Sequence, residues 1–579
     1  MAKRNQSTPR RTARQRERRY RTAKELIGYE SMLADGIAYL GADRWSITLS
    51  LSDINYEMTT QERQAQLIGQ RAKFLNTFDG STRVQVTCRT RILDADDVAR
   101  MACMRLDGGR FDHLRADCNR IIMRKMDERS SNAITDKYLT LSITEEDAER
   151  AKATLNRLAK SASSELAALD GCKARILERG ERLRLLASLL RPGEPFRYRG
   201  DLIEEGLTAS KDFITPWHID SSDAARLRVL NAGGQTVRCA LWIRDFPPIM
   251  SDRLVGELSA IKSDLTLSVH LAPYDRSVGA ELVDRKIAEM DMQRLEERRR
   301  NMRRHIPADE IPAELRDSLD EAHRLRDEMR QSNERLVGAM AVIDVSASDR
   351  EELDQRVKDV SAACRRLSCT VEPLTYMQLD GLNAALPLGV NHLPMQRTLT
   401  TSGAAIMIPF STQEIMDPDG VCYGVNSHSG NLLVVDRTVK RNANGFILGT
   451  TGSGKSQAAK MEMTSLFLTR PDDELLIVDP EREYAPLCEA LQGTGVTISA
   501  GSANHQSNGH RPRRSAGQRS DPHEGQRRRD HGRGPGRRRR WAERRRTLHH
   551  RPVHARPVPR LAQRSRPCSS SKDHHSYPC

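Results

Sequence analysis

Apolar residues occupy every second position in four short segments of the first half of the chain. These segments are Ile47–Leu51, Val84–Cys88, Leu139–Ile143 and Leu265–Val269. A period of two is typical of β-strands that bury one face on a core and leave the other face half-exposed. With helical stretches between the strands, residues 24–278 are predicted to form an N-terminal α+β domain.

Between two of these strands, residues 145–190 carry Ala and Leu at helical spacing with charged residues elsewhere, which predicts helix. The segment Pro192–Pro195 (Pro-Gly-Glu-Pro) ends that helix and marks a joint within the domain. His218, Asp220 and Asp223 lie close together further along, but without a further ligand nearby in the sequence. We interpret these three residues as local caps and ion pairs and not as a metal site.

Residues 279–337 follow a different pattern, which predicts a helical hairpin. Val283, Ile287 and Met290 begin one amphipathic helix, and two prolines interrupt the pattern at Pro307 and Pro312. A second helix carries apolar residues seven apart, with two more on the same face: Leu315, Ala322, Met329 and Leu336, then Leu319 and Leu325. Two antiparallel helices fit this pattern. They are either an arm that docks a partner or a pair packed on its own domain.

Residues 338–425 are predicted to complete the α+β region. A strand at Ala341–Val345, a helix over 349–367 and a strand at Thr370–Pro373 form one unit. Turn residues at Asp417–Gly420 (Asp-Pro-Asp-Gly) then mark a linker.

A phosphate-binding motif follows the linker. Asn444–Leu448 is a short apolar run that predicts a strand, and it leads into Gly449–Ser456, which has the pattern GxxxxGK[ST]. A helix is predicted over Gln457–Leu468. The residues expected to bind nucleotide are Gly449, Thr450, Thr451, Gly452, Ser453, Gly454, Lys455, Ser456 and Gln457.

The spacing of this motif has a physical reason. Glycines let the loop turn back so that several N–H groups point into one concavity, and the helix dipole adds positive potential beneath the phosphates. Lys455 is expected to reach the β- and γ-phosphates of ATP, and the Ser456 hydroxyl is expected to bind Mg²⁺. The motif therefore predicts ATP and Mg²⁺ as ligands.

A second apolar run, Leu475–Asp479, predicts a strand with a carboxylate at its tip. Such an acid orders Mg²⁺ and its water in P-loop enzymes. However, Asp479 follows Lys455 by only one helix and one strand. Asp479 or Glu483 is therefore a catalytic candidate, or faces the nucleotide without being the catalytic acid.

The sequence of this region resembles the VirB-four-like ATPases of conjugation and type IV secretion. The resemblance is specific in NGFILGTTGSGKS, LLIVDPEREYAPL and GTGVTIS, and looser in the front half, for example at Ala168–Pro192. It covers about residues 24–505 and identifies residues 426–505 as the start of a RecA-like P-loop NTPase domain. Carried over by position, Gly449–Ser456 is the nucleotide loop and Asp479–Tyr484 the acidic motif beside it.

The resemblance implies a hexameric motor ATPase in the cytoplasm, peripheral to the membrane, that works with inner-membrane components of a conjugation channel. Contact with nucleic acid would be indirect at most. The family continues with a later acid-tipped strand and a sensor or arginine-finger region that this sequence lacks, so we expect weak hydrolysis. Two alternatives stay open: a hexameric DNA translocase of the same superfamily and a non-catalytic scaffold of the transfer machinery.

The charge of the chain is unevenly distributed. Its formal net charge is +15, but residues 506–579 hold 20 Arg and one Lys against five acids, which leaves 72 basic and 73 acidic side chains in residues 1–505. The basic excess is therefore no property of the folded part. The stretch also lacks Ile, Phe and Met, so it cannot bury a core and is predicted to be disordered. An Arg-rich nucleic-acid-binding segment is the other interpretation, although the stretch has few aromatic residues for stacking.

The remaining composition excludes several classes of protein. The 11 cysteines are odd in number and scattered, which fits reduced thiols in a cytosolic protein and not a disulfide framework. No apolar run reaches the roughly 20 residues that span a bilayer. Residues 1–23 are a basic arm without an apolar segment after it, so they do not form a secretory signal. The arm is either solvated or in contact with anionic lipid or nucleic acid.

The tail from Gln506 is predicted to be the wrong reading frame of its gene. A frame shifted by one base permits Asn-Pro-Met-Asp over Gln506–His510 and Ser-Ile-Ile-Asp-Arg-Cys-Thr over Leu548–His554. Both resemble the way the family continues, and both restore apolar residues. Sequencing the gene and translating the shifted frame should reveal an apolar strand that ends in Asp-Glu. If none appears, the tail is a genuine Arg-rich segment.

Overall fold

The computed structural model describes residues 22–57, 59–93, 95–127, 133–169, 171–247, 250–304, 312–331, 334–410, 415, 417, 420–426, 430–439, 442–470 and 472–497. Nearly all of the arm 1–23 and the whole of the tail 506–579 lie outside these residues. Every element named below belongs to one compact unit that ends at Gly495.

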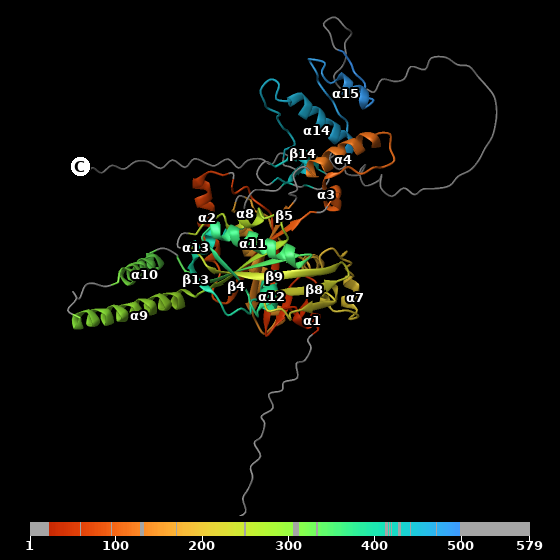
Figure 1. Ribbon diagram of the computed structural model, residues 1–579. Helices are drawn as coiled ribbons and strands as arrows, with labels where there is room; N and C mark the ends of the chain where they lie inside the picture. Colours follow the sequence, from red (N-terminus) through yellow and green to blue (C-terminus); the bar gives the residue numbers. More distant parts are fainter. Residues whose placement is uncertain are drawn as a thin grey trace, which may run out of the picture. The chain divides into compact units, whose positions relative to one another are not determined.

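A large antiparallel sheet organises this unit (Figure 1). Its strands run in the order β1 (Ser31–Met32), β2 (Ala38–Gly41), β3 (Arg44–Leu51), β5 (Ala133–Thr144), β4 (Thr82–Ile92), β10 (Leu265–Pro273), β11 (Leu336–Ala347), β9 (Gly234–Asp245), β8 (Leu227–Asn231) and β7 (His218–Asp220). Beside this path, β6 (Ala174–Ile176) pairs with β3, β12 (Thr370–Pro373) with β9 and β13 (Arg397–Thr400) with β11. The fold is thus mixed α/β, and the four strands predicted from alternation are β3, β4, β5 and β10.

One face of the sheet is apolar and carries the main core. Alternate strand residues such as Ile47, Leu141, Val269 and Ile343 are buried there. The helices that supply the other side of this core are α2 (Gln61–Leu75), α5 (Ala148–Ala167), α8 (Leu254–Ser259), α11 (Arg350–Arg366) and α13 (Thr401–Ile406). Figure 1 shows α11 and α12 (Gln378–Ala385) on opposite sides of β9.

The polar face of the same strands is also buried, which differs from the predicted half-exposed strands. Thr48, Thr140 and Ser268 have no exposed surface. Residues 384–389, here called the crossing segment, run beneath this face and take their hydrogen bonds from its side chains. Thr48 Oγ1 donates to Pro387 O over 3.1 Å, and Gln85 Nε2 donates to Leu386 O over 2.9 Å. Hydroxyl and amide groups therefore replace water on this face.

The predicted helix over 145–190 is two helices, α5 and α6 (Arg179–Leu190), separated by β6. Gly171, at a φ of 73°, lies in the turn after α5, and the chain then pairs briefly with β3. Helix α6 ends just before Pro192, as the breaker sequence predicts. Its Arg182 is fully buried and donates to Gly36 O over 2.7 Å and to Ser46 O over 2.9 Å. Pairing between distant segments thus overrides the helical pattern.

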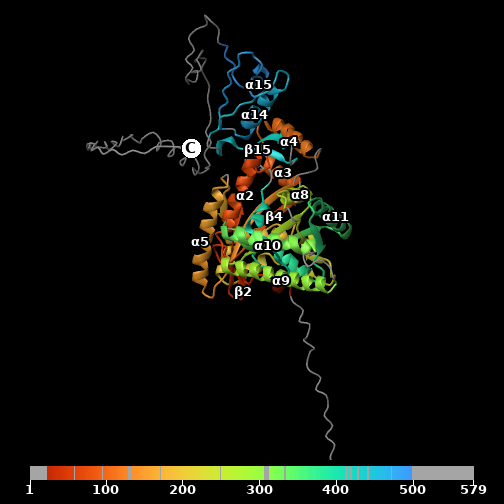
Figure 2. The ribbon, with the colours of Figure 1, turned by 90° about the vertical axis from the view of Figure 1, so that its left-hand side faces the viewer.

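Two long helices, α9 (Arg276–Arg303) and α10 (Ala313–Gln331), lie side by side in both views, and Figure 1 shows them extending from the sheet (Figures 1 and 2). A small apolar cluster between them contains the positions that the heptad pattern singled out: Val283, Ile287, Met290, Leu315, Leu319, Ala322, Leu325, Met329 and Leu336. The pattern was wrong at Leu336, which is the first residue of β11 and not part of the helix. Its side chain joins the cluster from the sheet.

The excursion between β4 and β5 carries two helices, α3 (Ala95–Ala102) and α4 (Asp112–Asp127). They pack on a separate hairpin of β14 (Val421–Val425) and β15 (Leu432–Val435). Asn431 also ties the hairpin to the start of β5, because its side chain bonds the Ala133 N–H over 3.1 Å and the Ala133 carbonyl over 2.6 Å. The hairpin leads the chain toward the phosphate-binding motif.

The smaller elements complete the described chain. They are α1 (Ala23–Leu26), α7 (Gly200–Glu204), the 3₁₀ turns η1 (Ser210–Phe213) and η2 (Arg437–Val439), α14 (Lys455–Thr469) and α15 (Ala485–Ala490). Within the described ranges, no helix combines the length and the apolar character needed to span a bilayer.

His270 on β10 makes stability depend on pH. Burial lowers its pKa from 6.5 to about 4, and its Nε2 lies 2.7 Å from Ala384 O. Because the folded pKa is depressed, the native state loses stability as pH falls from 6.5 toward 4, by up to about 3 kcal/mol. Denaturant unfolding at pH 7 and pH 4 should show a larger loss of stability in the wild type than in His270→Gln.

The exposed His392 provides the control, since His392→Gln should keep the wild-type pH dependence. Equal pH dependence in the wild type and in His270→Gln would contradict the prediction.

Candidate nucleotide-binding site

The motif residues Gly449–Gly454 form an exposed loop that runs directly into helix α14. Gly452 has a φ of 80° and Gly454 a φ of 86°, both in the left-handed region. Residues with a Cβ rarely adopt this conformation, so the two glycines are needed for the loop to turn. The predicted helix over Gln457–Leu468 is confirmed and begins slightly earlier, at Lys455.

The loop is closed by short contacts among its own residues. Ser453 N–H donates to Thr450 O over 3.2 Å, and a Cβ on Gly449 would lie only 2.4 Å from Ser453 Oγ. The Lys455 ammonium group donates to Thr450 O over 3.0 Å. The cation of the motif is therefore held over the loop by a backbone carbonyl.

This arrangement fits a nucleotide phosphate. The first N–H groups of α14 have no acceptor within the helix, and the helix dipole places positive potential at Lys455 and Ser456. The structure brings all nine predicted nucleotide-binding residues, Gly449 to Gln457, into this loop and the first helical turn. Ser456 lies in that turn, where a hydroxyl could serve Mg²⁺ beside a phosphate.

The two strands predicted around the motif are not formed. Residues 444–448 and 475–479 are irregular, and Phe446, Leu448, Leu476 and Val478 are 86–90% exposed. The prediction was wrong because a strand needs a hydrogen-bonded neighbour, and neither segment pairs with another over the described parts of residues 442–497. Their continuous apolar character is typical of parallel strands buried on both faces.

Asp479 lies in a turn in front of α15 and accepts backbone hydrogen bonds. Its Oδ2 is 2.8 Å from Tyr484 N, and the N–H groups of Tyr484 and of residues 481–483 hold the pKa of its carboxyl below the ordinary value. Arg482 adopts a φ of 60° in this turn. The Tyr484 ring lies 5.3 Å from the Lys460 ammonium on α14, and Glu483 is exposed beside it. A catalytic role for Asp479 or Glu483 stays a prediction.

Sequence reasoning missed the residues that anchor α14 along its length. Glu462 accepts a hydrogen bond from the Tyr423 hydroxyl over 2.6 Å and pairs with Arg437 over 2.8 Å. Burial, followed by the bond to Glu462, raises the pKa of Tyr423 to about 12. Arg470, directly after α14, pairs with Asp436 over 2.5 Å. No local pattern marks these contacts, because the partners come from the β14–β15 hairpin and its continuation.

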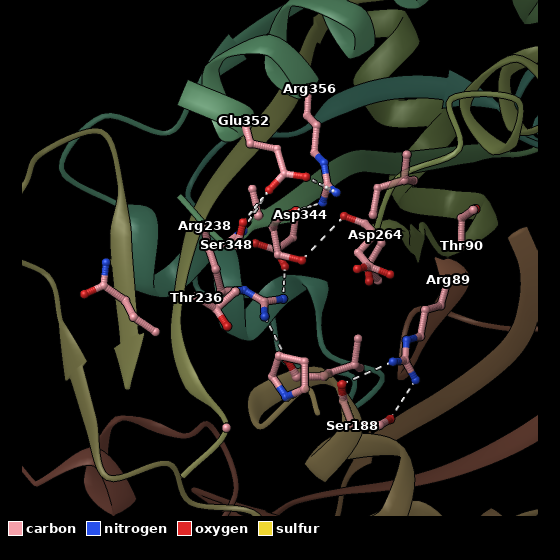
Figure 3. A pocket seen from close by; sticks show the side chains of 18 residues that line it. Arg89, Thr90, Ser188, Thr236, Arg238, Asp264, Asp344, Ser348, Glu352 and Arg356 are labelled. Carbon is pink, nitrogen blue, oxygen red and sulfur yellow. Dashed lines mark hydrogen bonds and ion pairs between the residues drawn. The ribbon is translucent and has the colours of Figure 1, made fainter. Parts of the chain in front are cut away.

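A polar cavity of about 350 Å³ lies at the ends of the central strands β4, β10, β11 and β9, between α6 and α11 (Figure 3). Arg238 pairs with Asp344, and both side chains are buried. Arg356 donates to Glu352 Oε1 over 2.6 Å, and Arg89 donates to Ser188 Oγ over 2.6 Å. Figure 3 shows these pairs along the cavity wall. Each of the three arginines that line the cavity therefore bonds an acceptor of the protein itself, which indicates a structural role at the ends of these strands.

The remaining polar clusters also act locally. Asp220 accepts a hydrogen bond from Ser222 N–H and pairs with Arg228, while Asp223 accepts one from Ala225 N–H. The backbone bond to Ser222 is the main reason why the pKa of Asp220 falls to about 2. Where the chain is described, His, Cys, Asp and Glu side chains form no group suited to a metal ion.

Comparison with known families supports the assignment of the loop. Residues 441–510 match the model of the DUF87 family, described as the central domain of the helicase HerA. This segment is therefore similar to a P-loop ATPase domain, which implies nucleotide binding, typically with Mg²⁺. The match ends close to Gln506, where the composition changes. No curated protein matches the chain.

The turn at Asp479 predicts a local effect of its removal. In Asp479→Ala, the N–H groups of residues 481–484 lose their shared acceptor, so their hydrogen exchange should accelerate. Hydrogen exchange read by mass spectrometry can measure this segment. Glu481→Ala is the matched control and should leave the exchange rates unchanged. Unchanged rates in Asp479→Ala would show that the carboxylate does not hold the turn.

Proposed function

We propose that the chain is an ATP-binding motor subunit of a conjugative transfer, or type IV secretion, apparatus of the VirB-four-like kind. The observation that carries the nucleotide-binding part is the glycine loop at the N-terminus of α14, with Lys455 above it. The similarity to a HerA-type P-loop domain supports a motor ATPase. The motif text at Asn444–Ser456 and Asp479–Tyr484 supports the finer assignment.

The loop would bind the phosphates of ATP by exchange of one acceptor for another. The Lys455 ammonium group now donates to the Thr450 carbonyl. A β- or γ-phosphate oxygen carries more negative charge than a carbonyl, so the ammonium would transfer to the phosphate when nucleotide arrives. The N–H groups of the loop and of the first turn of α14 would then surround the phosphates. Mg²⁺, held with the help of Ser456, would neutralise part of their charge.

The proposed assembly follows from the same resemblance. A motor of this kind is a homo-oligomer, hexameric in the family, that contacts inner-membrane components of the channel at the cytoplasmic face. The near-neutral charge of residues 1–505 supports indirect contact with nucleic acid, because DNA-binding surfaces carry a basic excess. A DNA translocase is the second candidate, favoured by the HerA-type match. A non-catalytic scaffold would bind no nucleotide.

Calorimetric titration of the full chain with ATP and Mg²⁺ tests the proposal. The wild type should bind ATP, and Lys455→Ala should weaken binding at least roughly tenfold, because a charge-assisted contact to the phosphates is lost. Ser456→Ala should weaken binding only when Mg²⁺ is present. Lys358→Ala removes an exposed lysine from α11 and serves as the control, with unchanged affinity.

Equal affinity in the wild type and in Lys455→Ala would overturn the nucleotide-binding proposal. Repeating the titration with duplex DNA separates the two motor candidates. A DNA translocase should show DNA-dependent affinity or turnover that falls steeply with salt, whereas the secretion motor should respond to DNA weakly.

A further inference from the structure

We propose that helix α4 binds the C-terminal end of the nucleotide-binding helix α14 through Arg115. Arg115 thereby positions the phosphate-binding loop at the other end of α14 and couples nucleotide occupancy to the central sheet. The inference rests on the proposed function, since it concerns the loop that would hold ATP. It assigns a role to the α3–α4 excursion, which otherwise has none.

Arg115 is the centre of the contact. Its Nε donates to Leu468 O over 3.2 Å, and its side chain is only 7% exposed. Leu468 lies in the last turn of α14, where the carbonyl groups receive no hydrogen bond from an N–H group within the helix. These carbonyls also carry the negative end of the helix dipole. A buried guanidinium group at this position therefore completes a helix end that would otherwise be unsatisfied.

The direction of Arg115 is fixed from its own side. Its Nη1 pairs with Asp112 over 2.8 Å and with Asp107. The two carboxylates fix the planar guanidinium group, so Nε points at α14 and not into solvent. This arrangement indicates a built contact and not a chance approach of a long side chain.

Two further contacts lie beside Arg115. The Phe111 and Phe467 rings meet edge to face with their centroids 5.4 Å apart. Arg110 Nη1 donates to Gln492 Oε1 over 2.7 Å, just beyond α15. The segment 110–115 thus touches α14 and the turn that follows α15.

Helix α14 connects the contact at Arg115 with the phosphate-binding loop. It extends without interruption from Lys455 to Thr469, a length of about 22 Å at 1.5 Å per residue. Its backbone hydrogen bonds resist stretching, so a shift at the loop moves the carbonyl that Arg115 holds. On the other side, α3 and α4 are joined to the neighbouring strands β4 and β5 and pack on the β14–β15 hairpin through Val98, Ile122 and Val434.

Hydrogen exchange of the full chain with and without ATP–Mg²⁺ tests the coupling. In the wild type, ATP should slow exchange in the phosphate-binding loop and also in α4. Arg115→Met should bind ATP roughly fivefold more weakly, keep the protection of the loop and lose that of α4. Arg115→Lys retains the charge without the planar fork and should be intermediate.

Arg120→Met is the matched control, because Arg120 lies on the same helix, is 76% exposed and pairs only with Asp117 among the described contacts. It should behave as the wild type. Loop protection without α4 protection in the wild type overturns the inference, and this result needs no variant to fold. Wild-type affinity and α4 protection in Arg115→Met overturn it as well. Failure of the wild type to bind ATP overturns the proposed function and the inference together.

Discussion

The buried backbone of the crossing segment needs hydrogen-bond partners beneath the central sheet. Much of the structure depends on the strand side chains that supply these partners. Gln85 makes three hydrogen bonds to it: its Nε2 donates to Ala384 O over 3.1 Å and to Leu386 O over 2.9 Å, and its Oε1 accepts from Gly389 N–H over 2.7 Å. Gly389 has a φ of 78°, and a Cβ there would lie 3.0 Å from Ser142 Cβ, so the segment passes in close contact with the strands. Without these polar side chains the segment would leave buried carbonyls unpaired.

The strands could be predicted from the sequence, but the environment of their polar face could not. Alternation places Thr48, Thr140 and Ser268 opposite the core, and the same alternation is found whether that face meets water or buried backbone. The difference lies in residues 384–389, more than a hundred residues beyond the nearest of these strands. Leu336 shows the same limit on a smaller scale, because a heptad position and the first residue of a strand both require an apolar side chain. Local pattern identifies the apolar core positions, but it does not show whether the opposite face of a strand is covered or what covers it.

The candidate site also has a part that could be predicted from local sequence and a part that could not. The loop and the start of α14 follow from glycine spacing and helix capping within a few residues, so the motif predicted them correctly. The flanking strands depend on neighbours, and those segments stay irregular and exposed at Phe446 and Leu476. The contact between Arg115 and Leu468 joins residues 353 positions apart and has no local signature. Structure that depends on residues within one turn can be predicted from the sequence. Contacts between residues far apart in the chain become visible only in the folded structure.

The turn at Asp479 and the phosphate-binding loop use the same physical device. In the turn, backbone N–H groups converge on the Asp479 carboxylate and lower its pKa, because oriented amides stabilise an anion. The loop Gly449–Ser456 contains no acidic residue, so it brings no anion of its own to the first turn of α14. One ammonium group, on Lys455, faces the same loop from the helix that follows it. Residues 1–505 are almost neutral overall, so long-range attraction contributes little to phosphate binding. Recognition of a phosphate at this loop would therefore rest on backbone geometry together with the Lys455 ammonium group. Under our proposal, contacts that fix this geometry, including the contact of Arg115 with α14, would help to determine the affinity for nucleotide.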